Sequence, residues 1–208
     1  MSKYILSTLV FISCLDVYAR PKVFIIDTGV NKKVYKYITG DSPSKRGDID
    51  YYTRSHGSHI ASIIVNNATC EIEIESCDYF ENRYKYYICL ERAIKSNADI
   101  VNMSLAGYIE DEREEALVKR LLASGKKIYA AVGNNSKDLD KLKERVFPAS
   151  YEGVTAVENI AQSSNHLKKA IKINGQDILG KDYLNNEVVM SGSSQATAIL
   201  TGRDICKH

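Results

Sequence analysis

Four separated segments of the chain carry side chains that together could transfer an acyl group. They supply a carboxylate, two imidazoles, a carboxamide and two adjacent hydroxyls: Asp27, His56, His59, Asn134, Ser193 and Ser194. Acyl transfer by a serine needs a nucleophilic hydroxyl, a base for its proton, a carboxylate that orients the base, and donors for the oxyanion. The chain contains each of these residue types. Together they suggest hydrolysis with a serine as the nucleophile.

Each segment has another interpretation when taken alone. A strand that ends in Asp-Thr-Gly also occurs in aspartic proteases, but a single such segment would require a homodimer and would leave the other segments without a role. His56 and His59 would face the same side of a helix, yet no further motif supplies a third metal ligand. Asn134 follows Gly133 as in an ordinary turn, and Gly-Ser-Ser is typical of a loop or a helix N-cap.

Alternating strands and helices are expected to position these segments. Apolar or alternating runs predict strands at residues 22–26, 71–75, 100–105, 127–132 and 154–157. Helical spacing predicts helices at residues 55–66, 82–96, 111–124 and 194–200, the last ended by Gly202. This alternation implies an α/β protein with a mainly parallel sheet, whose site lies beyond the carboxyl ends of the strands. Asp27, Ser104 and Asn134 all fall at or near such ends.

In this order, the segments resemble the Asp, His, Asn and Ser signatures of subtilisin-like serine proteases. The segments are residues 23–29, 55–61, 130–134 and 191–196. Residues 102–107 resemble that family's substrate-binding strand, and residues 147–157 resemble the stretch after its oxyanion asparagine. The likeness spans about residues 21–203 and implies the subtilisin-like three-layer fold, a mainly parallel central sheet flanked by helices.

The resemblance also implies roles for individual residues. Asp27, His56 and Ser194 would form the catalytic triad, with the Asn134 carboxamide and the backbone N–H of Ser194 as oxyanion donors. His59 would be a structural neighbour of the base. These roles imply a serine endopeptidase that hydrolyses protein or peptide substrates through an acyl-enzyme, without a cofactor or a metal.

Seven further residues would contact substrate by the same resemblance. One wall of the groove would pair with the substrate backbone, and the other would face it: Ser104, Leu105 and Ala106, then Ala131, Val132 and Gly133. Val146 matches a pocket-floor position often held by Gly in the family. A Val at that position predicts a preference for small or medium side chains before the scissile bond.

The chain departs from the family pattern in several places. Gln195, Thr197 and Ala198 stand where Met, Pro and His are usual, and the usual calcium loops are not recognisable. Few residues follow Ser194, and the first core strand leaves no room for the usual propeptide. A catalytically weak or inactive secreted binding protein that keeps the subtilisin-like fold is therefore the alternative. An α/β-hydrolase esterase is disfavoured because Gly-x-Ser-x-Gly is absent and the chain order differs.

The N-terminus and the cysteines indicate export. Lys3, an apolar run and Val-Tyr-Ala predict a signal peptide over residues 1–19, which leaves a peptidase domain at residues 20–208. In the alternative, Cys14 is acylated as a lipoprotein anchor. Either route places the protein outside the cytoplasm, and we expect a monomer with no membrane span. The net charge of +2 is too small to indicate a nucleic-acid partner.

Four cysteines remain after the predicted cleavage, and an even number in an exported chain predicts disulfides. They are Cys70, Cys77, Cys89 and Cys206. Three pairings are open, and Cys70 and Cys77 are close enough in sequence to bridge locally.

Overall fold

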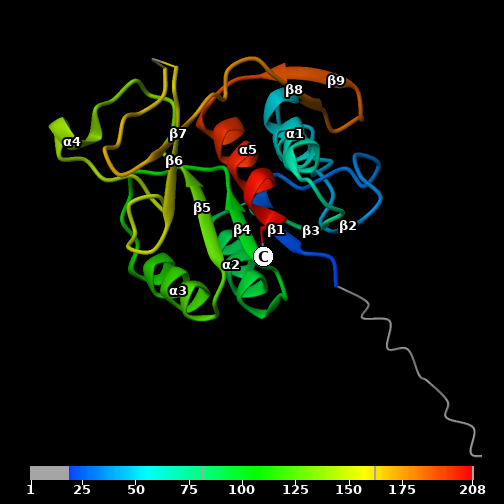
Figure 1. Ribbon diagram of the computed structural model, residues 1–208, viewed down its shortest axis with the longest axis horizontal. Coiled ribbons are helices and arrows are strands. Elements are labelled where there is room, and N and C mark those ends of the chain that lie inside the picture. Colours follow the sequence, from blue (N-terminus) through cyan, green and yellow to red (C-terminus); the bar gives the residue numbers. More distant parts are fainter. Residues whose placement is uncertain (1–18, 81, 162, 208) are drawn as a thin grey trace, which may run out of the picture.

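The computed structural model describes residues 19–80, 82–161 and 163–207. The predicted signal peptide, apart from its last residue, and the alternative anchor Cys14 lie outside the described residues. At the centre is a seven-stranded sheet in the order β2-β3-β1-β4-β5-β6-β7, with every neighbouring pair parallel (Figure 1). Its strands are β1 (Lys22–Asp27), β2 (Ile38–Gly40), β3 (Glu73–Asp78), β4 (Ile100–Met103), β5 (Lys127–Ala131), β6 (Thr155–Asn159) and β7 (Ile171–Ile173).

Helices cover both faces of this sheet, as predicted. One face carries α1 (Tyr51–Asn67) and α5 (Ser193–Ile205), and the other carries α2 (Arg83–Lys95) and α3 (Glu112–Ala123) (Figure 1). An antiparallel hairpin of β8 (Ile178–Lys181) and β9 (Glu187–Met190) packs beside α1, and the short α4 (Leu139–Leu142) lies apart near β6 and β7. The mainly parallel three-layer α/β architecture is therefore confirmed.

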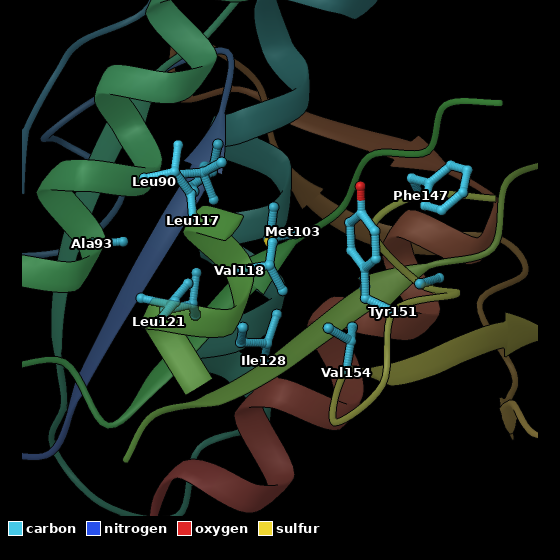
Figure 2. Close-up of a cluster of buried hydrophobic side chains, with 14 of the residues drawn as sticks. Leu90, Ala93, Met103, Leu117, Val118, Leu121, Ile128, Phe147, Tyr151 and Val154 are labelled. Atoms are coloured by element: carbon cyan, nitrogen blue, oxygen red, sulfur yellow. The ribbon is translucent and has the colours of Figure 1, made fainter. Parts of the chain in front are cut away.

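Apolar side chains fill the space between each helical layer and the sheet. Figure 2 shows the α2–α3 side, where residues of both helices meet residues of β4, β5 and the chain that follows β5: Leu90, Ala93, Leu117, Val118, Leu121, Met103, Ile128, Phe147, Tyr151 and Val154. A second cluster joins α1 and α5 to the opposite face. Each fully buried large aliphatic side chain contributes about 1.5–3 kcal/mol, so both layers are firmly attached.

Helix boundaries differ from the predictions because caps and close contacts set them. α1 begins at Tyr51, four residues before the predicted start, because the Asp50 carboxylate accepts a hydrogen bond from the Thr53 N–H at 3.0 Å. The predicted end of the last helix at Gly202 is wrong, since α5 continues to Ile205. Gly202 lies where α5 crosses α1, and a Cβ there would lie 2.5 Å from the carbonyl oxygen of Ile64. A glycine is needed at that crossing rather than at a helix end.

The sequence patterns did not predict the short strands. β2 and β7 have three residues each and β8 and β9 four, too few for alternation to register. The alternating segment predicted at residues 71–75 forms β3 two residues later, at Glu73–Asp78, because it pairs with β1 in that register.

Two disulfides join the cysteines in one of the three open pairings. Cys70 is bonded to Cys206 and Cys77 to Cys89, so the local Cys70–Cys77 bridge is not formed. The first bond ties the C-terminal cap of α5 to the segment after α1, and the second ties α2 to β3. Within the described ranges, none of the helices is long and apolar enough to cross a bilayer.

Candidate active site

Asp27 ends β1, at the point where the sheet order reverses direction and where α/β proteins usually bind ligands. Its side chain is 2% exposed. The Thr28 N–H donates to its Oδ1 at 2.8 Å. His56 Nδ1 lies 2.8 Å from Oδ1 and 3.0 Å from Oδ2. This contact fixes the imidazole with Nδ1 toward the carboxylate and leaves Nε2 for other chemistry.

The carboxylate also controls the protonation of His56. Burial disfavours the charged imidazolium, but the negative charge and hydrogen bond of Asp27 outweigh it and raise the pKa of His56 above 6.5. His56 stands in the second turn of α1, which the Asp50 cap and the buried face of the helix hold in place. A histidine arranged in this way can accept a proton and keep it as a stabilised cation.

Ser194 lies in the first turn of α5, where unpaired backbone N–H groups and the helix dipole favour negative charge. The preceding N-cap is Gly192, with φ +151°, and a Cβ there would lie 2.8 Å from Asn134 Nδ2. Asn134 follows β5, and its Oδ1 accepts a hydrogen bond from the Ser193 N–H at 2.8 Å. The amide nitrogen of Asn134 is therefore held beside the start of α5.

Ser104, just after β4, makes two contacts with the predicted nucleophile. Its carbonyl oxygen accepts a hydrogen bond from Ser194 Oγ at 3.0 Å, and its own hydroxyl donates to the Ser194 carbonyl at 3.0 Å. The Ser194 hydroxyl proton must turn away from this carbonyl before His56 can accept it. Asn102 donates to the Ser104 hydroxyl at 3.0 Å and accepts from Thr201 at 2.9 Å, so buried polar groups fix β4 against α5.

One cleft of about 520 Å³ gathers most of these groups. His56, Ser194, Asn134 and Ser104 all line it. The other lining residues come from the segments after β1 and β3, from α1, from β9 and the residue after it, and from α5: Thr28, Tyr79, Phe80, Tyr52, Thr53, Val189, Met190, Ser191 and Gln195. The structure thus brings three of the four predicted catalytic residues to one surface, with Asp27 buried behind His56. A base, a hydroxyl and an amide donor in one cleft have the composition of an acyl-transfer site.

The sequence of this chain matches the model of a known protein family. Residues 10–203 match the model of the subtilase family, peptidase family S8. This chain belongs to the subtilase family.

Two curated relatives are similar to this subtilase over only part of their length. The major intracellular serine protease of Bacillus subtilis (strain 168) is 24% identical over 163 residues, which cover 67% of this chain and 51% of the relative. The thermostable alkaline protease of Halalkalibacterium halodurans is 25% identical over 202 residues, which cover 87% of this chain and 55% of the relative. The chain therefore spans about half the length of the curated relatives it matches.

Solved structures support the subtilase fold at low sequence identity. A lanthipeptide protease superposes with a TM-score of 0.76 at 15% identity, covering 89% of this chain and 72% of the other. A cold-adapted subtilisin-like serine proteinase gives 0.72 at 19% identity, covering 89% and 74%. The self-cleaved protease domain of PatA gives 0.73 at 22% identity, covering 89% and 78%.

The two predicted walls of the groove differ in exposure. Ser104 lines the cleft, and Leu105 and Ala106 line an adjoining hollow of about 410 Å³. On the opposite side Gly133 is partly exposed, but the side chains of Ala131, Val132 and Val146 are at most 1% exposed. Val132 and Val146 belong to the apolar cluster on the α2–α3 side of the sheet, and Ala131 is buried as well. The predicted size limit imposed by Val146 remains a prediction.

The departures of this subtilase from its family pattern have structural counterparts near the site. His59 Nε2 lies 3.1 Å from the Ile178 carbonyl and donates to it, which leaves Nδ1 as an acceptor 3.5 Å from Gln195 Nε2. Burial is the main cause that lowers the pKa of His59, so it stays neutral. Thr197, in place of proline, donates to the Ser193 carbonyl at 2.8 Å within α5. These contacts accommodate the substituted side chains.

The sequence patterns missed the aromatic and hairpin parts of the cleft. Tyr52 and Phe80 are 66% and 42% exposed beside the site, but isolated aromatics carry no periodic signal. Val189 and Met190 enter through the β8–β9 hairpin, whose short strands were not predicted. Among the described residues, no group of three or more His, Cys, Asp or Glu is placed to hold a metal ion.

Proposed function

We propose that this subtilase is a serine endopeptidase that hydrolyses peptide bonds of protein or peptide substrates through an acyl-enzyme. The observation that carries the proposal is the contact between buried Asp27 and partly exposed His56, 2.8 Å between Oδ1 and Nδ1, at the cleft that Ser194 and Asn134 also line. The named activities of the two relatives, serine protease and alkaline protease, support the same reaction class.

The proposed reaction has two halves, acylation of Ser194 and hydrolysis of the acyl-enzyme, and His56 transfers protons in both. His56 removes the Ser194 hydroxyl proton as Oγ attacks the scissile carbonyl carbon, and the oxyanion accepts hydrogen bonds from Asn134 Nδ2 and the Ser194 N–H. Asp27 stabilises the imidazolium, which then protonates the leaving amine as the C–N bond breaks. Water deprotonated by His56 attacks the ester, and the proton returns to Ser194 as the acid is released.

We also propose that the protein acts outside the cytoplasm. The N-terminal pattern ending at Ala19 supports export. The two disulfides support it as well, because disulfides persist mainly in oxidising compartments. Secretion would be tested by recovering the mature chain from culture medium and determining its N-terminal residue. A chain kept in the cytoplasm with residues 1–19 intact would contradict this part of the proposal.

The second candidate is a binding protein that keeps the fold without turnover. The observation in its favour is the hydrogen bond from Ser194 Oγ to the Ser104 carbonyl, which directs the hydroxyl proton away from His56. Catalytic hydrogen bonds are often formed only in the substrate complex, so labelling of the serine separates the two candidates.

A fluorophosphonate probe tests the proposed function directly. The native protein should become labelled on Ser194, Ser194→Ala should not, and Ser191→Ala should label as the native protein does. Ser191 is the matched control because it lines the same cleft and, among the residues that the structure describes, its hydroxyl bonds to Asp177. A folded native protein that is neither labelled nor able to cleave a peptide library would favour the binding protein.

A further inference from the structure

Asn165 lies directly behind the loop that carries the proposed oxyanion donor. This oxyanion loop is residues 132–137, and the Asn165 side chain is 0% exposed. Its Oδ1 accepts hydrogen bonds from the N–H groups of Asn135 and Lys137, both at 3.1 Å. Its Nδ2 donates to the Val132 carbonyl at 2.7 Å and to the Tyr108 hydroxyl at 2.8 Å. Both N–H donors and both acceptor positions of the Asn165 carboxamide are therefore used, three of them in bonds to the loop that carries Asn134 and one in a bond to Tyr108.

The backbone around Asn165 follows the oxyanion loop closely. The Asn165 N–H donates to the Gly133 carbonyl at 2.9 Å, and the His166 N–H donates to the Lys137 carbonyl at 2.7 Å. In the other direction, the Ser136 N–H donates to the Ser163 carbonyl at 3.1 Å. Residues 132, 133, 135, 136 and 137 are thus all bonded to the segment 163–166, and Asn134 is carried between them.

Tyr108 extends this support to the opposite wall of the groove. Its hydroxyl accepts from Asn165 and donates to Asn135 Oδ1 at 3.0 Å. Tyr108 follows Ala106 and Gly107 in the segment that lines the adjoining hollow. The same hydrogen-bonded group therefore joins the substrate-binding segment after β4 to the loop after β5.

The Asn134 side chain receives a hydrogen bond from α5, whereas the backbone on both sides of Asn134 is bonded to Asn165 and its neighbours. Asn134 Oδ1 accepts from the Ser193 N–H at 2.8 Å, while the Asn134 side chain is exposed at the cleft. We propose that Asn165 is a positioning residue for the oxyanion hole, acting through Asn134, an inference that rests on the proposed function. An oxyanion donor contributes only if it lies at hydrogen-bond distance from the developing charge, so a small displacement of the loop reduces turnover.

The expected effect is on turnover rather than on substrate affinity. Loss of a whole oxyanion donor costs about 10²–10³-fold in kcat, so Asn165→Ala, which misplaces the donor, should cost roughly 10–100-fold with KM little changed. Tyr108→Phe removes one partner at a 41% exposed position and should fold normally. It should lower kcat by a smaller factor.

A double-mutant cycle with Asn134→Ala separates positioning from general damage. If Asn165 acts through Asn134, the double variant should have the kcat of Asn134→Ala alone, within about twofold, because coupled residues are not additive. Tyr108→Phe should likewise have no further effect in that background. Losses in kcat that multiply for both pairs would overturn the proposal.

Asp182→Ala is the matched control. Asp182 is 1% exposed and holds a different turn, between β8 and β9, by accepting from the N–H groups of Leu184 and Asn186 at 2.8 and 2.7 Å. Its effect on kcat, whatever the size, should multiply with that of Asn134→Ala.

Amide hydrogen exchange makes the proposal testable even if the native protein proves inactive. In the native protein the N–H groups of Asn135 and Lys137 should exchange slowly, and in Asn165→Ala they should exchange faster while the N–H groups of α5 stay protected. Unchanged exchange at Asn135 and Lys137 would overturn the positioning role. A native protein that neither labels with fluorophosphonate nor cleaves peptide would instead overturn the proposed function.

Discussion

At the scale of single residues, Asp27 is a buried carboxylate whose charge needs compensation. Burying an ionised carboxylate costs several kcal/mol unless hydrogen bonds and an opposite charge offset the cost. Thr28 supplies a backbone N–H at 2.8 Å, and His56 supplies a partner at 2.8 Å. The attraction between Asp27 and His56 is therefore strongest when His56 is protonated. In the proposed reaction, this is the state that follows proton transfer from Ser194.

Asp27→Asn tests this coupling through the pH dependence of catalysis. The raised pKa of His56 places the acid limb of the native kcat/KM profile above pH 6.5, because only the neutral imidazole accepts a proton. The variant should lose about 10⁴-fold in kcat, as triads without their carboxylate do. Its acid limb should move to lower pH, since burial remains while the charge of Asp27 is gone.

The control for Asp27→Asn is Asp78→Asn. Asp78 is the register partner of Asp27 on β3, but its carboxylate accepts from the Phe80 N–H, and the charge that raises the pKa of His56 is that of Asp27. The profile of Asp78→Asn should keep the native acid limb. An unchanged acid limb in Asp27→Asn would contradict the assignment of the pair.

Val146 offers a test of the predicted substrate preference. Val146→Ala removes two methyl groups from a 0% exposed position under the groove. If the alignment with the pocket floor holds, kcat/KM for peptides with Phe or Tyr before the scissile bond should rise relative to those with Ala. One or two methylene equivalents are worth about 1–3 kcal/mol in such pockets. A native enzyme that already prefers Phe or Tyr would show that the alignment is wrong.

Residue types were predictable at this scale, but their resting contacts were not. Asp27, His56, Asn134 and Ser194 stand in short motifs that can be identified in the sequence. The hydrogen bond from Ser194 to Ser104 depends on how α5 packs against β4. The support from Asn165 comes from a polar loop without periodicity, so no sequence pattern indicated it.

At the scale of elements, long periodic segments were predictable and short ones were not. β1, β4, β5 and β6 are central strands buried on both faces, which produces continuous apolar runs. The two-stranded hairpin and the edge strands bury only part of their surface, so their sequences carry mixed signals. The cleft wall formed by β9 was therefore missed.

Glu114 is an element-scale feature that carries a stability prediction. It lies in the first turn of α3, is 5% exposed, and accepts from the Tyr86 hydroxyl of α2 at 2.9 Å. Burial is the main cause that raises the pKa of Glu114 to about 6, against 4.5 for the free group. Since the folded pKa lies above the unfolded one, this group stabilises the fold below pH 4.5, and that contribution is lost as pH rises through about 6.

Glu114→Gln should therefore remove a pH-dependent penalty. The amide of Gln keeps an acceptor for the Tyr86 hydroxyl. Well above pH 6, the free energy of unfolding of the variant should be about 1 kcal/mol higher than that of the native protein. This figure allows for a small loss of the favourable interaction between the carboxylate and the dipole of α3. Well below pH 4.5 the two should be equal. Urea titrations at both pH values measure this, with the more exposed Glu115→Gln as control. A lower stability of Glu114→Gln at the higher pH would contradict the assignment.

At the scale of the whole molecule, the site exists because α1 and α5 pack against each other over one face of the sheet (Figure 1). α1 presents His56 and α5 presents Ser194 at their N-terminal ends. The family resemblance implied this arrangement, but the disulfide pairing could not be deduced. Sequence spacing left three pairings open, and the local Cys70–Cys77 bridge that it allowed is not the one formed. The pairing follows from which elements become neighbours only after folding.

The two disulfides should differ in their contribution to stability, because they close loops of very different length. Cys70 and Cys206 are 136 residues apart, and Cys77 and Cys89 are 12 apart. In the chain-entropy model these loops correspond to about 5 and about 3 kcal/mol. Cys70→Ala/Cys206→Ala should therefore lower the free energy of unfolding more than Cys77→Ala/Cys89→Ala, as measured by denaturant titration. The buried positions of Cys77 and Cys89 add a cavity cost that narrows the difference.

The Cys70–Cys206 bond also anchors the C-terminal end of α5, the helix that carries Ser194. Its loss should therefore reduce fluorophosphonate labelling of Ser194 at temperatures where the rest of the fold persists. Full labelling up to global unfolding would show that the α1–α5 contact alone holds the nucleophile in place.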